Sequence, residues 1–259
     1  MRRLVVELPP SRAARWSGRL AVFAAMVCGL AVVLGRLDRI ELQAALAAIG
    51  AGLLLAVAAA VLAGIAFVSV WQDGRPGFRA ALGGLVVAVA LVAWPVVLAV
   101  QALRLPRLAD VSTDIMDPPG FSRSRRAIDA RGGLVPPDPA PESRIAQQAA
   151  YPALTPLTLE LPIQDAFILA QKAVQQRGWQ LVEATAPGPR TGNGRIDAVD
   201  RSLLLRIPAD VTIRLRTVAG GTRLDIRSAS RFGAHDLGEN ARRVQGFVQA
   251  LNELVEARD

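Results

Sequence analysis

The sequence predicts two parts: an all-α transmembrane region, and an α+β domain whose antiparallel sheet carries helices on one face. Three observations lead to this prediction. Residues 1–103 are dominated by Ala, Val, Leu and Gly and hold three long apolar segments. Residues 151–259 show the hydrophobic periods of strands and helices in turn. Residues 104–150 are rich in Pro, Gly and Arg, which predicts a linker without long regular structure.

The three apolar segments are candidate membrane helices. A bilayer core about 30 Å thick needs roughly 20 apolar residues in a helix. The first segment, from Leu20 to Gly35, is short and would need Arg19 and Arg36 to reach toward the headgroups. No acidic or basic residue lies inside any segment, which argues against a proton-coupled carrier. We predict helices over about residues 17–37, 44–71 and 79–103, with two spans as the alternative.

Small residues recur at four-residue spacing in the second and third segments. This spacing lets helices approach closely, although the abundance of alanine explains it equally well. The residues are Ala56, Ala60 and Gly64, followed by Ala80, Gly84 and Ala88.

Arginines flanking the segments predict the orientation. Seven lie at the N-terminus and after the second segment, against four on the opposite side. Because arginine-rich flanks stay in the cytoplasm, the N-terminus is predicted there. Three spans then place the C-terminal domain in the periplasm of a bacterial inner membrane, whereas two would leave it in the cytoplasm. The seven are Arg2, Arg3, Arg12, Arg15, Arg19, Arg75 and Arg79, and the four are Arg36, Arg39, Arg104 and Arg107.

The remaining composition argues against several classes of function. From Arg104 onward the chain has 21 of its 30 basic and 18 of its 22 acidic residues, without a basic cluster interleaved with aromatics, so we expect no nucleic-acid partner. Cys28 is the only cysteine, so neither a disulfide within the chain nor a CxxC site is possible. Asp110, Asp114 and Asp117 lack the alternation and the glycine of a calcium loop. We therefore predict no metal and no cofactor.

The elements expected after residue 151 are a strand, a helix, several antiparallel strands and a long helix. Gly178 is a natural end for the first helix. Asp236 and Glu239 have the spacing of a capping box at the start of the second. Helices are predicted over 163–178 and about 237–257, and strands within 156–161, 179–186, 194–207, 210–218 and 222–230.

Two glycines, Gly220 and Gly221, predict a hairpin turn between the last two strands. This turn would place Arg216 opposite Asp225. It would also place Arg214 opposite Arg227, a repulsive pair unless an acid or a ligand lies between them. On the other face, Ile213, Leu215 and Thr217 would lie opposite Ser228, Ile226 and Leu224.

The polar residues of this hairpin support two functional hypotheses. Arginines beside a helix N-terminus could accept a phosphate or carboxylate headgroup, and a solvated ion-paired surface is the alternative. A hydrolase-like enzyme would instead use His235 as base, Asp236 or Asp225 to orient it, and Ser228 or Ser230 as nucleophile. We assign no catalytic residues, because the chain has no nucleophile elbow and Asp236 suffices as a helix cap. The candidate anion face comprises Arg214, Arg216, Arg227 and Arg231 with Asp225.

Three stretches of the chain resemble a known family. They are "LPRLADVSTDIMDPPGF", "AFILAQKAVQQRGWQLVEA" and "IRSASRFGAHDLGENARRVQGFVQAL", within about residues 104–255. They resemble the uncharacterised bacterial and plastid family called domain of unknown function 1499. The chain departs from the family pattern at Ala209, where relatives often have Asp, and at His235, where they have a small residue. The residues that carry the resemblance at the strand-to-helix joint are Ser228, Ser230, Asp236, Gly238 and Asn240.

The resemblance implies an N-terminal membrane segment but no established activity. Together with the residue patterns, it predicts a membrane-anchored, non-enzymatic binding or assembly module of the cell envelope. The expected partners are the lipid bilayer and either an anionic envelope ligand or another membrane protein. A periplasmic enzyme that uses the joint around His235 is the alternative.

Overall fold

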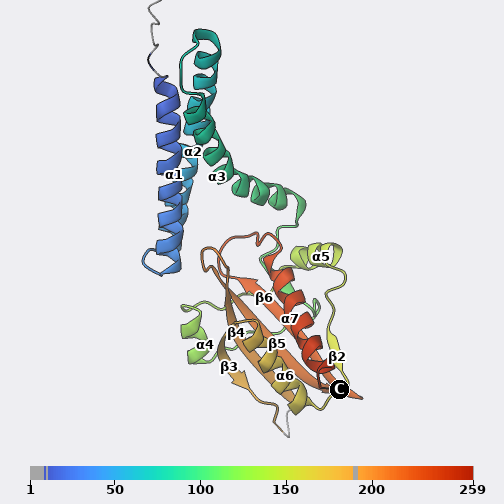
Figure 1. Ribbon diagram of the computed structural model, residues 1–259. Coiled ribbons are helices and arrows are strands. Elements are labelled where there is room, and N and C mark those ends of the chain that lie inside the picture. Colours follow the sequence, from blue (N-terminus) through green and yellow to red (C-terminus); the bar gives the residue numbers. More distant parts are fainter. Residues whose placement is uncertain (1–8, 10, 189–191, 259) are drawn as a thin grey trace, which may run out of the picture. The chain divides into compact units, whose positions relative to one another are not determined.

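A computed structural model describes residues 9, 11–188 and 192–258 (Figure 1). The chain divides into two compact units, Met1–Val100 and Gln101–Asp259. The first unit contains three helices, each long and apolar enough to cross a membrane, which confirms the three predicted segments. The first helix begins earlier than expected, because Ser11 caps it by accepting a hydrogen bond from the Ala14 amide. The helices are α1 (Arg12–Arg36), α2 (Leu42–Asp73) and α3 (Phe78–Arg104), the last of which ends in the second unit.

Small side chains form the contacts among these helices. A Cβ atom at Gly52 would collide with the Cys28 sulfur, and one at Gly84 would collide with the Ser17 hydroxyl. The contact face of α2 does not follow the predicted four-residue spacing, since Gly64 is exposed. It alternates steps of three and four residues, which keeps one stripe facing the neighbouring helices. The buried small residues of α2 are Ala45, Gly52, Ala56, Ala59, Ala63 and Ala66.

The second unit is built on an antiparallel sheet, as predicted. Its strands are ordered β1-β6-β5-β4-β3, and β2 also pairs with β6. Helices α6 (Ile163–Gln176) and α7 (Glu239–Glu256) cover one face (Figure 1). This arrangement confirms the α+β fold. The strands are β1 (Asp110–Ser112), β2 (Leu157–Leu159), β3 (Gln180–Thr185), β4 (Asn193–Arg201), β5 (Pro208–Val218) and β6 (Gly221–Ser230).

The apolar core lies between this sheet and the two helices. Ile213 and Leu215 of β5 point into it and are fully buried. The rings of Trp179 and Phe247 stack there with their centroids 5.7 Å apart. One face of the sheet is thus occupied by the core, so polar chemistry is confined to the opposite face and to the strand ends.

The predicted register of the β5–β6 hairpin is wrong by two residues. Val218 pairs with Gly221, so Ala219 and Gly220 form the turn and Gly221 is already part of β6. Gly220 has the positive φ that such a turn requires. Gly221 lies so close to the Leu159 carbonyl of β2 that a Cβ atom would collide with it. A shift by two keeps each side chain on its face but changes its partner: Arg214 lies opposite Asp225, Arg216 opposite Arg223, and Arg227 opposite Thr212.

Residues 104–150, predicted to be a linker, instead contribute to the second unit. They contain β1, α4 (Arg125–Ala130) and α5 (Pro141–Ala150). Ala127 of α4 packs against Val182 and Val199 on the sheet face that α6 and α7 leave open. These elements are short because proline and glycine interrupt them. They bind the sheet through polar contacts of their backbone and side chains, and a hydrophobic period in the sequence does not predict such contacts.

Candidate functional site

Three arginines surround one buried carboxylate on the open face of the sheet. Asp225 of β6 is fully buried. Its side chain accepts hydrogen bonds from Arg214 Nη2 at 2.9 Å, Arg216 Nη2 at 2.8 Å and Arg223 Nε at 3.0 Å. The hydrogen bond from Arg223 to Asp225 is the main reason why the pKa of Arg223 is raised. Asp225 is therefore an ion-pair centre that holds three guanidinium groups in place.

Two further acids reach the same arginines from the segment between β1 and α4. The Oδ2 atom of Asp114 lies 2.6 Å from Arg223 Nη2, and that of Asp117 lies 3.0 Å from Arg214 Nη1. The aspartates that could have formed a calcium loop thus bind guanidinium groups. In the described part of the chain, no group of three or more His, Cys, Asp or Glu side chains could hold a metal ion. We call this set the arginine–aspartate cluster: Arg214, Arg216, Arg223, Asp114, Asp117 and Asp225.

Arg227 does not join the other arginines on an exposed anion face. Its side chain is only 1% exposed, with Nη2 2.7 Å from Asp110 Oδ2. Nη1 donates to the Pro119 carbonyl, and the guanidinium lies 4.9 Å from the centre of the Phe121 ring. Burial raises the pKa of Asp110 even though Arg227 opposes this effect. Arg227 is therefore an internal anchor for residues 113–131, which run from β1 to the end of α4 over the open face of the sheet and which we call the covering segment.

Arg231 is also separate from the cluster. Its guanidinium pairs with Asp210, with Nη2 2.7 Å from Oδ1, and donates to the Ala130 carbonyl at the end of α4. The predicted anion face thus divides: Arg214 and Arg216 remain together with Asp225, whereas Arg227 and Arg231 bind the covering segment.

Serines of the covering segment bind acids of β3 and β4. Ser122 and Ser124 each donate a hydroxyl hydrogen bond of 2.7 Å to Glu183, which lowers the pKa of that carboxyl. The amide of Ser122 also donates to Asp197, whose pKa is raised by burial. Arg131 closes the arrangement by donating to the Ser122 carbonyl at 2.7 Å. These contacts position the segment along the sheet.

A groove of about 580 Å³ lies beside the arginine–aspartate cluster and is the candidate binding site. Arg195, Arg214 and Arg216 line it, together with Thr185 and Asn193. Arg195 of β4 lies directly opposite Arg214 of β5. Arg214 has three aspartate partners, but within the described residues no carboxylate lies at ion-pair distance from Arg195. Among the described residues Arg195 thus has no ion-pair partner in direct contact, although Glu183 and Asp197 are near enough to interact with it electrostatically.

Arg195 is not among the predicted site residues, although the sequence contains a signal for it. Alternation in β4 places Arg195 on the same face as Asp197, and the pairing of β4 with β5 brings it beside Arg214. The sequence predicts this strand, within residues 194–207, but not its register with β5. Arg195 becomes recognisable only when the two strands are aligned.

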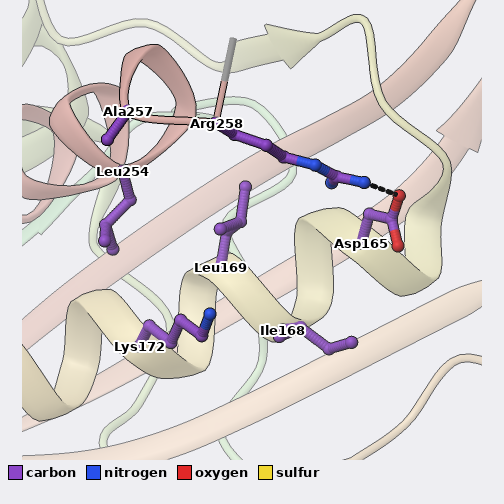
Figure 2. Close-up of a pocket in the computed structure, with 7 residues that line it drawn as sticks. All are labelled: Asp165, Ile168, Leu169, Lys172, Leu254, Ala257 and Arg258. Atoms are coloured by element: carbon purple, nitrogen blue, oxygen red, sulfur yellow. Dashed lines mark hydrogen bonds and ion pairs between the residues drawn. The ribbon is translucent and has the colours of Figure 1, made fainter.

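A second hollow, of about 490 Å³, lies between α6 and the end of α7. Figure 2 shows the ion pair of Asp165 with Arg258, 2.7 Å long, beside the apolar side chains of Ile168 and Leu169. Lys172 is the only other charged residue that lines it. A single lysine beside a closed ion pair recognises an anion less well than three converging arginines, so we place the candidate site in the groove.

The strand-to-helix joint is a closed network of hydrogen bonds. Asn240 is fully buried. Its side-chain amide donates from Nδ2 to Ser230 Oγ at 3.0 Å and accepts at Oδ1 from Ser228 Oγ at 2.8 Å. Asp236 accepts from the backbone amides of Gly238 and Asn240. The N-cap of α7 is Gly238, and Glu239 is the first helical residue, so the predicted capping box of Asp236 and Glu239 does not form. The residues of the joint thus bind one another and hold α7 on the sheet.

This geometry does not bring together the residues of the alternative, hydrolase-like hypothesis. His235 Nδ1 accepts from the Leu237 amide at 3.0 Å, and Nε2 lies 3.1 Å from the Ala102 carbonyl. With Nδ1 acting as acceptor, Nε2 carries the proton and donates to Ala102. Both ring nitrogens are therefore engaged with the backbone, and the hydroxyls of Ser228 and Ser230 bind Asn240 instead.

The fold and these contacts define the class of protein: three candidate membrane helices joined to an α+β domain with an arginine-lined groove. The chain belongs to the family described as "Protein of unknown function (DUF1499)", whose model matches residues 110–251. The match begins at the first residue of β1, which agrees with the place of the covering segment in the domain. No curated protein matches the chain.

Proposed function

We propose that the protein is a membrane-anchored, non-enzymatic binding module of the cell envelope that holds an anionic ligand in the arginine groove. The observation that carries this proposal is the position of Arg195, opposite Arg214 and without an acidic partner among the described residues. Like charges directly opposite each other destabilise a sheet. An anion between the two guanidiniums removes that repulsion and gains charge-assisted hydrogen bonds.

The chemistry of the groove favours a phosphate group. Guanidinium groups present two parallel donors that match the oxygens of phosphate, and Thr185 and Asn193 add neutral polar groups beside them. Arg214 and Arg216 are already held by Asp225, so binding costs little additional side-chain entropy. A phosphorylated envelope molecule or a phospholipid headgroup has the required charge.

We expect Arg195→Gln to weaken phosphate binding by roughly tenfold to a hundredfold, because a hydrogen bond to a charged group contributes about 1.5–3 kcal/mol. The measurement is calorimetric titration of the full-length protein in detergent micelles with inorganic phosphate, then with glycerol phosphate, which represents a lipid headgroup. Arg258→Gln is the matched control: it removes the same charge near α6, on the other face of the sheet. Equal losses in both variants, or no binding by the unaltered protein, would contradict the proposal and favour a protein partner.

The proposed location of the groove is the periplasm of a bacterial inner membrane. The supporting observations are three candidate membrane helices and the excess of arginine on the N-terminal side. Alkaline phosphatase fused after Asp259 should then be active in intact cells, because that enzyme folds only outside the cytoplasm. A fusion after Gly74, between α2 and α3, should be inactive. The opposite pattern would place the domain in the cytoplasm.

A further inference from the structure

Large apolar side chains stand exposed at one end of the sheet. Leu203, 86% exposed, and Leu204 lie in the loop between β4 and β5, and Phe232, 48% exposed, follows β6. The two loops are neighbours, since the Arg231 amide donates to the Pro208 carbonyl. Exposed leucine and phenylalanine gathered at loop tips indicate a contact surface.

The chain from the third membrane helix enters the domain at this same end. The Ala109 carbonyl accepts from the Ser230 amide at 2.7 Å, and the Leu108 carbonyl accepts from the Asp236 amide at 2.9 Å. Ala109 follows Arg104, the last residue of α3, by only five positions. Five residues span at most about 18 Å. A bilayer that holds α3 therefore lies within reach of the two loops.

The charges around the loops suit the surface of a bilayer. Arg201 is the last residue of β4 and Arg206 lies in the β4–β5 connection, while Arg104 and Arg107 flank the point where the chain leaves α3. The nearby acids have partners within the domain: Asp200 pairs with Arg243, and Asp236 accepts from the backbone amide of Asn240. Apolar tips bordered by arginines are typical of segments that lie in the headgroup layer.

We propose that the β4–β5 loop and Phe232 dock on the lipid bilayer, with Leu203, Leu204 and Phe232 inserted among the headgroups. The occupant of this surface is the membrane that holds α3, because the short connection to α3 keeps it nearby. The surface is distinct from the arginine groove, since Arg195 lies six residues before Arg201 on β4, about 20 Å along the strand. The groove can therefore face water while the loops contact lipid.

The test places a polarity-sensitive fluorophore on single cysteines in the full-length protein, with Cys28 replaced by alanine. The sites are Leu203→Cys and Phe232→Cys. Each has a control of matched exposure elsewhere: Met116→Cys at 85% and Ile168→Cys at 49%. The protein is placed in nanodiscs of phosphatidylcholine and phosphatidylglycerol, and quenching by lipids with a nitroxide near the headgroup is measured.

We expect a blue-shifted emission and strong quenching at residues 203 and 232, and neither effect at residues 116 and 168. Replacing Leu204 with aspartate in the labelled proteins should reduce the quenching at 203 toward the control level. Quenching at 203 and 232 that does not exceed the controls would overturn the proposal. A blue shift without lipid quenching would also overturn it, because it would show that protein covers the loops.

Discussion

Replacing Asp225 with alanine should destabilise the α+β domain by about 3–5 kcal/mol, the usual cost of removing one partner from a buried ion pair. Asp225 is fully buried and is the carboxylate that Arg214, Arg216 and Arg223 share. Without it, three guanidiniums would face each other on neighbouring strands with only Asp114 and Asp117 to balance them. Repulsion on the sheet and the loss of the buried hydrogen bonds act in the same direction.

Tryptophan fluorescence can follow this loss in the full-length protein. Trp179 is buried against Phe247, and replacing Trp16, Trp71 and Trp94 with phenylalanine leaves it as the only reporter. Guanidinium titration in micelles then gives the free energy of unfolding.

Asp117→Ala is the matched control for Asp225→Ala. It removes the same charge from the same cluster, but the Asp117 side chain is 66% exposed. Its cost should stay below about 1 kcal/mol, because water screens exposed ion pairs. Equal costs for the two substitutions would show that Asp225 is not the centre of the cluster.

The second large effect is expected for Arg227→Met, again about 3–5 kcal/mol. Methionine fills much of the same space but leaves Asp110 without its buried partner and the Pro119 carbonyl without a donor. Adding Asp110→Asn should recover part of the loss, because the uncompensated charge is then gone. Arg258→Met, at an exposed ion pair, should cost less than about 1 kcal/mol. A double variant no more stable than Arg227→Met would contradict this account.

The pH dependence of Arg227→Met provides an independent check. Burial raises the pKa of Asp110, whereas Arg227 lowers it. Removing Arg227 should therefore raise the pKa of Asp110 further. Between the ordinary aspartate pKa and this raised value, the folded protein keeps a proton that the unfolded chain has lost. Stability therefore falls as pH rises through that window. The deficit relative to the unaltered protein should be larger at neutral than at acidic pH, and a constant deficit would show that Asp110 is not responsible.

The sequence was informative wherever the evidence was local. Apolar length predicted the three membrane helices, and alternation and helical periods predicted the α+β fold with strands and helices near their observed positions. The helix end at Gly178 also follows from local chemistry. These features depend on neighbouring residues along the chain, so one sequence suffices to predict them.

The functional site depended on contacts between distant residues. A two-residue change in register leaves the alternation of β5 and β6 intact, so the pattern could not show that Arg214 lies opposite Asp225. The Pro- and Gly-rich segment has no period that marks its packing, yet its acids and carbonyls bind Arg214, Arg227 and Arg231.

By itself, then, the sequence determined the membrane segments, the fold class and the family resemblance, because each is written in residue order. Only the tertiary structure decided that Arg214 and Arg216 pair with aspartates, whereas Arg195 beside them has no ion-pair partner among the described residues. Charge compensation depends on distances across strands and loops, and these distances are set when the covering segment closes over the sheet. Arg195 lines the groove opposite Arg214, and this position is the basis of the ligand proposal.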